Sequence, residues 1–228
     1  MNGESSELTA WVALMVIGLG VILFLVVSIR FTKKRQKGQE TLQSLGFKPI
    51  PRDTTLEMRL RNLYGNPYAF FRELYQRRMP DSVLYVFGLD TPDGVLISRG
   101  IAIMSSNLSL PPFKIFPKID SKQFGLGKLA NQMIEQAVSR VDEKVEFPEF
   151  PEFNKKYLLF SGDQKGVRKF FTDRMADYFS GTNLVGIITE GDLLVFEDYS
   201  TPFAQDALSA LNQHVRQAIE IYRLFQSH

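Results

Sequence analysis

The sequence contains no cysteine, only two histidines and a single tryptophan among its 228 residues. Without cysteine the chain has no disulfide, no thiolate nucleophile and no Cys-ligated metal. The histidines, His214 and His228, belong to no H-E-x-x-H motif, and no G-x-S-x-G nucleophile elbow is present. We therefore expect no catalytic residue, no metal site and no cofactor site.

A basic surplus is missing from the bulk of the chain. Of the 27 basic and 25 acidic residues, five basic and three acidic ones precede residue 41, so residues 41–228 carry 22 of each. Binding to nucleic acid requires surplus positive charge that neutralises phosphates. The balance therefore argues against a nucleic-acid partner.

Charge is also missing from residues 8–29, which read LTAWVALMVIGLGVILFLVVSI. A helix of this length, at about 1.5 Å per residue, spans the roughly 30 Å hydrocarbon layer of a bilayer. A cleaved signal peptide would have a basic start and a shorter apolar core, and a buried helix of a soluble domain would have a polar face. The run predicts a transmembrane helix over residues 8–29 after a short tail, residues 1–7.

The charges that flank this segment predict its orientation. No basic residue precedes it, whereas five follow it closely: Arg30, Lys33, Lys34, Arg35 and Lys37. Positive flanks stay on the cytoplasmic side. We expect a single-pass membrane protein, with the N-terminus outside and the C-terminal domain cytoplasmic. A second interpretation of the basic cluster is contact with anionic lipid, worth about 1 kcal/mol per residue.

The remainder divides into a basic juxtamembrane linker, residues 30–55, and one domain, residues 56–228. Residues 83–87 and 95–97 flank the turn Asp90-Thr-Pro-Asp-Gly, and residues 184–189 and 193–197 flank Glu190-Gly-Asp. Apolar residues at helical spacing predict helices near 56–63, 126–141, 165–179 and 204–225. Strands joined by hairpins and interleaved with helices indicate an α+β fold, a largely antiparallel sheet packed by two or three helices.

Three details of this fold are also predicted. Pro111, Pro112 and Pro117 predict that residues 110–118 form an edge strand, because proline cannot donate to a central ladder. Gly100 indicates a bulge. Residues 68–79 suit a helix and a strand equally well.

The last predicted helix carries an apolar stripe with alternating spacings of four and three. Its members are Ala204, Leu208, Leu211, Val215, Ala218, Tyr222 and Phe225. The stripe is typical of a coiled-coil seam that forms a homodimer, and equally of a helix that packs on its own sheet.

The segment Phe147-Pro-Glu-Phe-Pro-Glu-Phe153 repeats with a period of three. A polyproline II helix has three residues per turn and would align Phe147, Phe150 and Phe153 on one face. The strip could dock a partner protein, or it could be a rigid extended connector whose phenylalanines cover the core.

Other motifs indicate chemistry only weakly. Gly125-Leu-Gly127-Lys128 lacks the spacing of a phosphate loop, and the acidic residues between 142 and 152 lack the ligand order of a calcium site. Asp163 and Arg168, beside a predicted strand end, are the remaining candidates for a ligand pocket.

Two longer motifs carry a resemblance to known proteins. They are the run Leu110-Pro-Pro-Phe-Lys-Ile-Phe-Pro117 and the stretch from Phe147 to Phe171, which contains Ser-Gly-Asp-Gln-Lys-Gly. The chain resembles a group of uncharacterised bacterial single-pass membrane proteins with a cytoplasmic α+β domain. The resemblance implies an inner-membrane location and no particular activity.

Taken together, the sequence favours a membrane-anchored, non-enzymatic binding or assembly domain whose partner is a protein. The alternative is a small-ligand sensor or an enzyme with a pocket of dispersed Asp, Arg and Tyr residues.

Overall fold

The computed structural model describes residues 39–65, 68–90, 96–118, 142–182, 184–198 and 207–226. The chain divides into two compact units, Met1–Leu45 and Gly46–His228. In the first unit residues 39–44 are helical. The second unit begins at Gly46 rather than at residue 56, so the end of the predicted linker belongs to the folded domain. The fold described below is that of the second unit.

The described part of this unit contains one sheet of nine strands, in the order β1-β2-β3-β4-β9-β8-β5-β7-β6. All neighbouring pairs are antiparallel. The strands are β1 Lys48–Pro49, β2 Phe70–Arg78, β3 Val83–Asp90, β4 Leu96–Met104, β5 Leu110–Pro117, β6 Glu143–Val145, β7 Tyr157–Ser161, β8 Val185–Gly191 and β9 Leu193–Asp198. The predicted α+β class and antiparallel sheet are confirmed.

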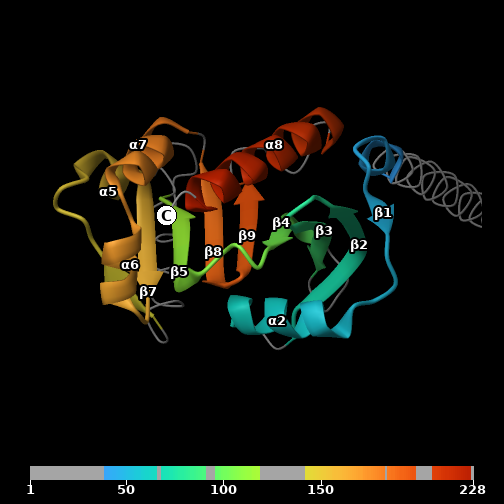
Figure 1. The fold of residues 1–228 in the computed structure, drawn as a ribbon, viewed down its shortest axis with the longest axis horizontal. Helices are drawn as coiled ribbons and strands as arrows, with labels where there is room; N and C mark the ends of the chain where they lie inside the picture. The colour runs from blue at the N-terminus through green and yellow to red at the C-terminus, as the bar shows by residue number, and fades with distance from the viewer. Residues whose placement is uncertain are drawn as a thin grey trace, which may run out of the picture. The chain divides into compact units, whose positions relative to one another are not determined.

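Helices lie on both faces of the sheet (Figure 1). They are α2 Thr54–Tyr64, α5 Pro151–Lys156, α6 Gln164–Phe170, α7 Asp173–Gly181 and α8 Ala207–Gln226. Figure 1 shows α8 along the upper face of the sheet and α2 below it. The predicted helix at 165–179 is two helices, α6 and α7, and the predicted helix at 126–141 lies outside the described residues.

Helix α2 is defined by its two ends and by one apolar face. The Asp53 carboxylate accepts a hydrogen bond from the Leu56 N–H at 3.0 Å, and Gly65 ends the helix with φ +63°. Its buried leucines, Leu56, Leu60 and Leu63, pack against Tyr85, Phe87, Ala102 and Val195 of the sheet. This face is one half of the core and holds α2 rigidly on β3, β4 and β9.

The apolar stripe of α8 covers the other face. Its buried members include Leu211, Val215, Ala218, Tyr222 and Phe225, and the helix contacts β4 and β9. The stripe packs on the sheet of its own chain, so these residues form no exposed seam for a second copy. Ala204 and the side chain of Leu208 lie outside the described part.

Strand β5 corrects a prediction, because it lies between β8 and β7 and not at an edge. The register shifts between Leu110 and Phe113, where the prolines occur. The Thr189 hydroxyl donates to the carbonyl of Pro111 at 2.8 Å, and that of Ser161 to Pro112 at 2.6 Å. The hydroxyls of two buried side chains thus bond to the proline carbonyls where the prolines interrupt the ladder of backbone hydrogen bonds.

The predicted bulge at Gly100 is also wrong, because β4 pairs with β3 and β9 through Gly100 without a shift. The glycine has a packing role. A Cβ atom there would lie 2.4 Å from Cζ of Phe87, so the ring occupies the place of a side chain. The ambiguous stretch at 68–79 forms strand β2.

Candidate functional site

The predicted membrane elements fall outside the described residues. These are the apolar segment 8–29 and the basic cluster Arg30, Lys33, Lys34, Arg35 and Lys37. Within the residues that the structure does describe, no helix is both long enough and apolar enough to span a bilayer. The transmembrane helix therefore stays a prediction of the sequence.

The phenylalanine strip differs from its predicted form. Phe147 and Phe153 are each 1 % exposed, and helix α5 begins at Pro151, so the segment is not a polyproline II helix. Phe147 stacks on Phe171 with 4.8 Å between ring centroids, and Phe153 packs on the same ring. Phe150 is half-buried beside them. The segment is a connector whose aromatic side chains fill the core, but it is not extended throughout as the alternative interpretation assumed, because α5 begins within it.

The pocket candidates Asp163 and Arg168 have structural positions. Asp163 caps helix α6, because its carboxylate accepts from the Gly166 N–H at 2.9 Å. The Arg168 guanidinium lies 5.4 Å from the centroid of the Phe147 ring, a cation–π distance. Neither side chain lines the hollows described below.

Three of the acidic residues between 142 and 152 form ion pairs with lysines. Asp142 pairs with Lys114 at 2.8 Å and Glu146 with Lys144 at 2.9 Å. Among the described residues no group of three His, Asp or Glu side chains could hold a metal ion.

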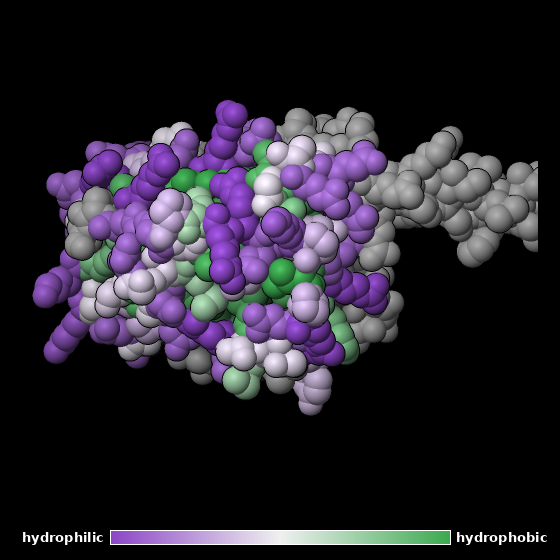
Figure 2. All heavy atoms as spheres, turned by 45° about the vertical axis from the view of Figure 1, so that its right-hand side comes forward, coloured by the Kyte–Doolittle hydropathy of each residue, from purple (hydrophilic) through white to green (hydrophobic). Residues whose placement is uncertain are grey.

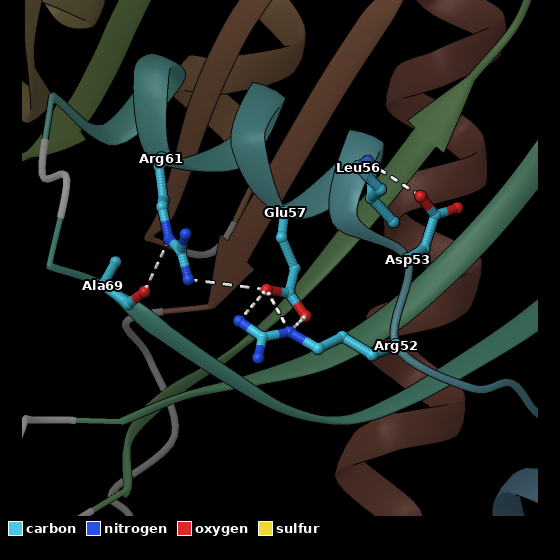
Figure 3. A network of polar contacts seen from close by, with 6 residues as sticks. All are labelled: Arg52, Asp53, Leu56, Glu57, Arg61 and Ala69. Carbon is cyan, nitrogen blue, oxygen red and sulfur yellow. Dashed lines mark hydrogen bonds and ion pairs between the residues drawn. The ribbon is translucent and has the colours of Figure 1, made fainter.

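A polar network joins Arg52 and helix α2 to Ala69, the residue before β2 (Figure 3). Glu57 is buried, and its carboxylate accepts from Nε of Arg52 at 2.9 Å and from Nη2 of Arg61 at 3.4 Å. Nε of Arg61 also donates to the backbone carbonyl of Ala69 at 3.0 Å. Two guanidinium groups thus share the Glu57 carboxylate, and Asp53 adds a second carboxylate to the same group of residues, so their charges balance.

Three large hydrophobic side chains between residues 58 and 70 are exposed. Met58, Tyr68 and Phe70 are 58 %, 76 % and 47 % exposed, and all lie within thirteen consecutive residues. The face drawn in Figure 2 shows apolar areas as small islands within a hydrophilic surface. Scattered exposed hydrophobic residues are ordinary. Phe71 packs against Tyr64 and Phe87 on the α2 face of the sheet, so the adjacent Phe70 points to the opposite face. We call Met58, with Arg52 and Arg61, the α2 patch.

A second candidate surface surrounds the turn between β2 and β3. Hollows of about 320 Å³ and 540 Å³ share the lining residues Met79, Pro80 and Asp81. The larger is also lined by Gln76 and Tyr85, and by Arg78, Ser106 and Asp192.

Ionisation in this region follows from identified contacts. Hydrogen bonds from Gln226 and Tyr222 lower the pKa of Asp81, and the Arg59 guanidinium lowers that of Asp192. Desolvation on burial raises the pKa of Tyr85. The hollow therefore offers two carboxylates, the Arg78 guanidinium, an amide and a phenol, a lining that suits a polar ligand.

Sequence reasoning missed both surfaces. The α2 patch is signalled in the sequence only by Met58, which lies off the leucine stripe of its helix. The hollow depends on contacts such as Tyr222 with Asp81, 141 residues apart.

No family model and no curated protein matches the chain. A solved structure does, the crystal structure of the mycobacterial trehalose monomycolate transport factor A, TtfA. The two chains share 10 % identity with a TM-score of 0.52, over 85 % of this chain and 92 % of TtfA. At this identity the similarity concerns the fold alone.

Proposed function

We propose that this chain is a membrane-tethered binding domain that acts, without catalysing a reaction, in the transport of a lipid at the bacterial inner membrane. The observation that carries the proposal is the shared fold, which covers 92 % of a protein named as a transport factor for trehalose monomycolate, a glycolipid. The apolar segment 8–29 supports the same location independently.

The proposed arrangement has one membrane pass and the domain in the cytoplasm. Basic residues follow the apolar segment and none precedes it, which favours this orientation. The folded domain has a neutral net charge and therefore no strong general attraction to nucleic acid. This suits a tethered domain that contacts other components of a transport assembly.

The polar groups of the described residues support binding over catalysis. The buried carboxylates have structural partners: Glu57 contacts two arginines, and Glu197 accepts from the Tyr64 hydroxyl at 2.6 Å. Asp163, which the sequence analysis named as a candidate for a ligand pocket, caps helix α6. Met58, Tyr68 and Phe70, by contrast, are exposed and available to a partner.

The proposal is tested by depleting the protein in its own bacterium and following newly made lipid with a radioactive acetate pulse. We expect labelled envelope lipid to accumulate in the inner membrane, and the full chain to restore its export. A chain in which residues 8–29 are deleted should not restore export. Unchanged export kinetics after depletion would contradict the proposal.

A second candidate function, a sensor of a small polar ligand, is favoured by the 540 Å³ hollow beside Asp81. A ligand that binds only the folded state raises its unfolding temperature. A thermal-shift screen of sugars and other polar metabolites against the full chain tests this candidate. Stabilisation that disappears in Gln76→Ala would support it, and no stabilisation by any compound would contradict it.

A further inference from the structure

The larger hollow at the turn between β2 and β3 is built on two rows of the sheet. Antiparallel pairing places Val83 between Arg78 and Met104 in one row, and Gln76 opposite Tyr85 in the next. Because side chains alternate between the two faces of a strand, residues two apart share one face. The side chains of both rows therefore lie on the same face of the sheet, where they line the hollow.

The rim of this hollow comes from loops at the same end of the sheet. Ser105 and Ser106 follow β4, Asp192 lies in the turn between β8 and β9, and Asp81 lies in the turn between β2 and β3. The ladders of β2, β3, β4, β8 and β9 fix the relative places of these groups. The lining is therefore formed before any ligand binds.

Three groups of the lining have hydrogen-bond donors that are not in use. In the described part of the chain the exposed Arg78 guanidinium has no hydrogen bond and no ion pair. Nε2 of Gln76 lies 3.5 Å from the Tyr85 hydroxyl, so that hydroxyl accepts from the amide and still has its own hydrogen to donate. The amide has a second hydrogen as well.

Asp81 supplies an acceptor. Its Oδ2 atom accepts from the Tyr222 hydroxyl at 2.9 Å and from Nε2 of Gln226 at 3.0 Å. Its Oδ1 atom has a longer contact, 3.4 Å from Oγ of Ser82. One oxygen thus holds the carboxylate in place, and the other keeps lone pairs for a ligand.

The charges of the lining balance. The Arg59 guanidinium of α2 forms an ion pair with Asp192 and compensates that carboxylate. The remaining two charges, those of Arg78 and Asp81, are equal and opposite. An ion of either sign would meet a like charge here, whereas a neutral ligand with both donors and acceptors satisfies both groups.

Hydroxyl groups meet these requirements, because each of them both donates and accepts. A sugar carries several on one small, uncharged ring, and the half-buried Val83 and Met104 offer apolar contact to its C–H groups. The volume of about 540 Å³ is that of a small-molecule site. An acyl chain would leave the polar lining without partners, which is unfavourable.

We propose that this hollow binds a neutral sugar, free or as the headgroup of a glycolipid, with Arg78, Gln76 and Tyr85 donating to its oxygens and Asp81 accepting from one hydroxyl. The inference rests on the small-ligand candidate of the proposed function and names its ligand class.

The test uses the full chain in phosphatidylcholine nanodiscs, which contain no sugar-based detergent. Saturation-transfer NMR measures the binding of glucose and of trehalose, with glucose 6-phosphate and glutamine as the anionic and zwitterionic comparisons. Arg78→Gln shortens the side chain and removes the charged donor from the hollow. Arg174→Gln is the matched control, because Arg174 is exposed on α7 and lies outside the hollow.

We expect both neutral sugars to bind the wild type. The dissociation constant should rise about tenfold in Arg78→Gln, because a hydrogen bond from a charged donor is lost, and should not change in Arg174→Gln. The unfolding temperature of Arg78→Gln should equal that of the wild type. Addition of a glucosyl diacylglycerol to the discs distinguishes the sources: loss of the glucose signal assigns a lipid headgroup, and an undiminished signal assigns a free sugar.

A stronger signal from glucose 6-phosphate or from glutamine than from glucose would overturn the sugar class and leave the small-ligand candidate standing. Undiminished binding by Arg78→Gln would overturn the placement of the sugar in this hollow, as would the absence of binding by both neutral sugars. None of these results bears on the proposed lipid transport, which is contradicted separately when depletion of the protein leaves export unchanged.

Discussion

The hydroxyl of Tyr222 in α8 lies 2.9 Å from a carboxylate oxygen of Asp81 in the turn between β2 and β3. The same hydroxyl is 2.9 Å from Oγ of Ser105, and Nε2 of Gln226 donates to the Asp81 carboxylate at 3.0 Å. The last turn of α8 is thus joined to two loops at one end of the sheet. These bonds fix the helix on the face that it covers.

Asp81 should make stability depend on pH. Hydrogen bonds from Gln226 and Tyr222 lower its pKa below the ordinary value of 3.8, so its ionised form stabilises the folded state. This contribution is present above pH 3.8 and is lost as the pH falls through the lower pKa of the folded protein. We expect Asp81→Asn to unfold at a lower temperature than the wild type at pH 7, and the difference to vanish in acid. A difference that persists at the lowest pH would contradict this role.

Gly100 should not tolerate a side chain. In Gly100→Ala the new Cβ would meet the Phe87 ring at 2.4 Å, and overpacking of this kind destabilises by about 1–3 kcal/mol. Gly181→Ala is the control, because no atom lies within 4 Å of its Cβ position, and we expect a change of less than about 0.5 kcal/mol. Urea unfolding of both variants in detergent checks the pair. Equal stabilities would show that the ring moves aside freely.

Loss of the Glu57 side chain should lower the stability of the domain more than loss of the Arg52 side chain. Glu57→Ala leaves Arg61 without its carboxylate in a partly buried place, which we expect to destabilise by about 1–3 kcal/mol. Arg52→Ala removes an exposed partner, and we expect a much smaller effect. Thermal unfolding of the two variants gives the ranking. A larger loss in Arg52→Ala would contradict the burial of Glu57.

The phenylalanines of the strip should differ in their contribution to stability. Phe153→Ala removes a ring that contacts Tyr157, Phe171 and Phe179, and should destabilise by about 3–5 kcal/mol. Phe150→Ala, at a half-buried position, should destabilise less. Equilibrium unfolding of each variant measures the difference. Equal losses would show that Phe150 is as well packed as Phe153.

Sequence reasoning predicted the elements whose signals are local. The strands β3, β8 and β9 and the helix α2 have β-branched runs, turn residues or a cap within a few positions, and each occurs where it was expected. The central place of β5 was not predictable, because Thr189 and Ser161 from distant segments accommodate its prolines. Nor does any glycine or proline mark the break between α6 and α7 at Phe171 and Thr172.

The candidate surfaces were less predictable than the fold. Exposure of Tyr68 and Phe70 depends on how β2 meets α2, and the hollow depends on where α8 ends. Both are results of tertiary packing. The periodicity of the phenylalanine strip indicated an extended conformation, but the proline at 151 begins a helix instead, a position that suits its fixed φ.

The membrane span of residues 8–29 is the central claim, and extraction of bacterial membranes with alkaline sodium carbonate tests it most directly. We predict that the full chain stays in the membrane pellet and that a chain in which residues 8–29 are deleted moves to the supernatant. Release of the full chain into the supernatant would contradict the account.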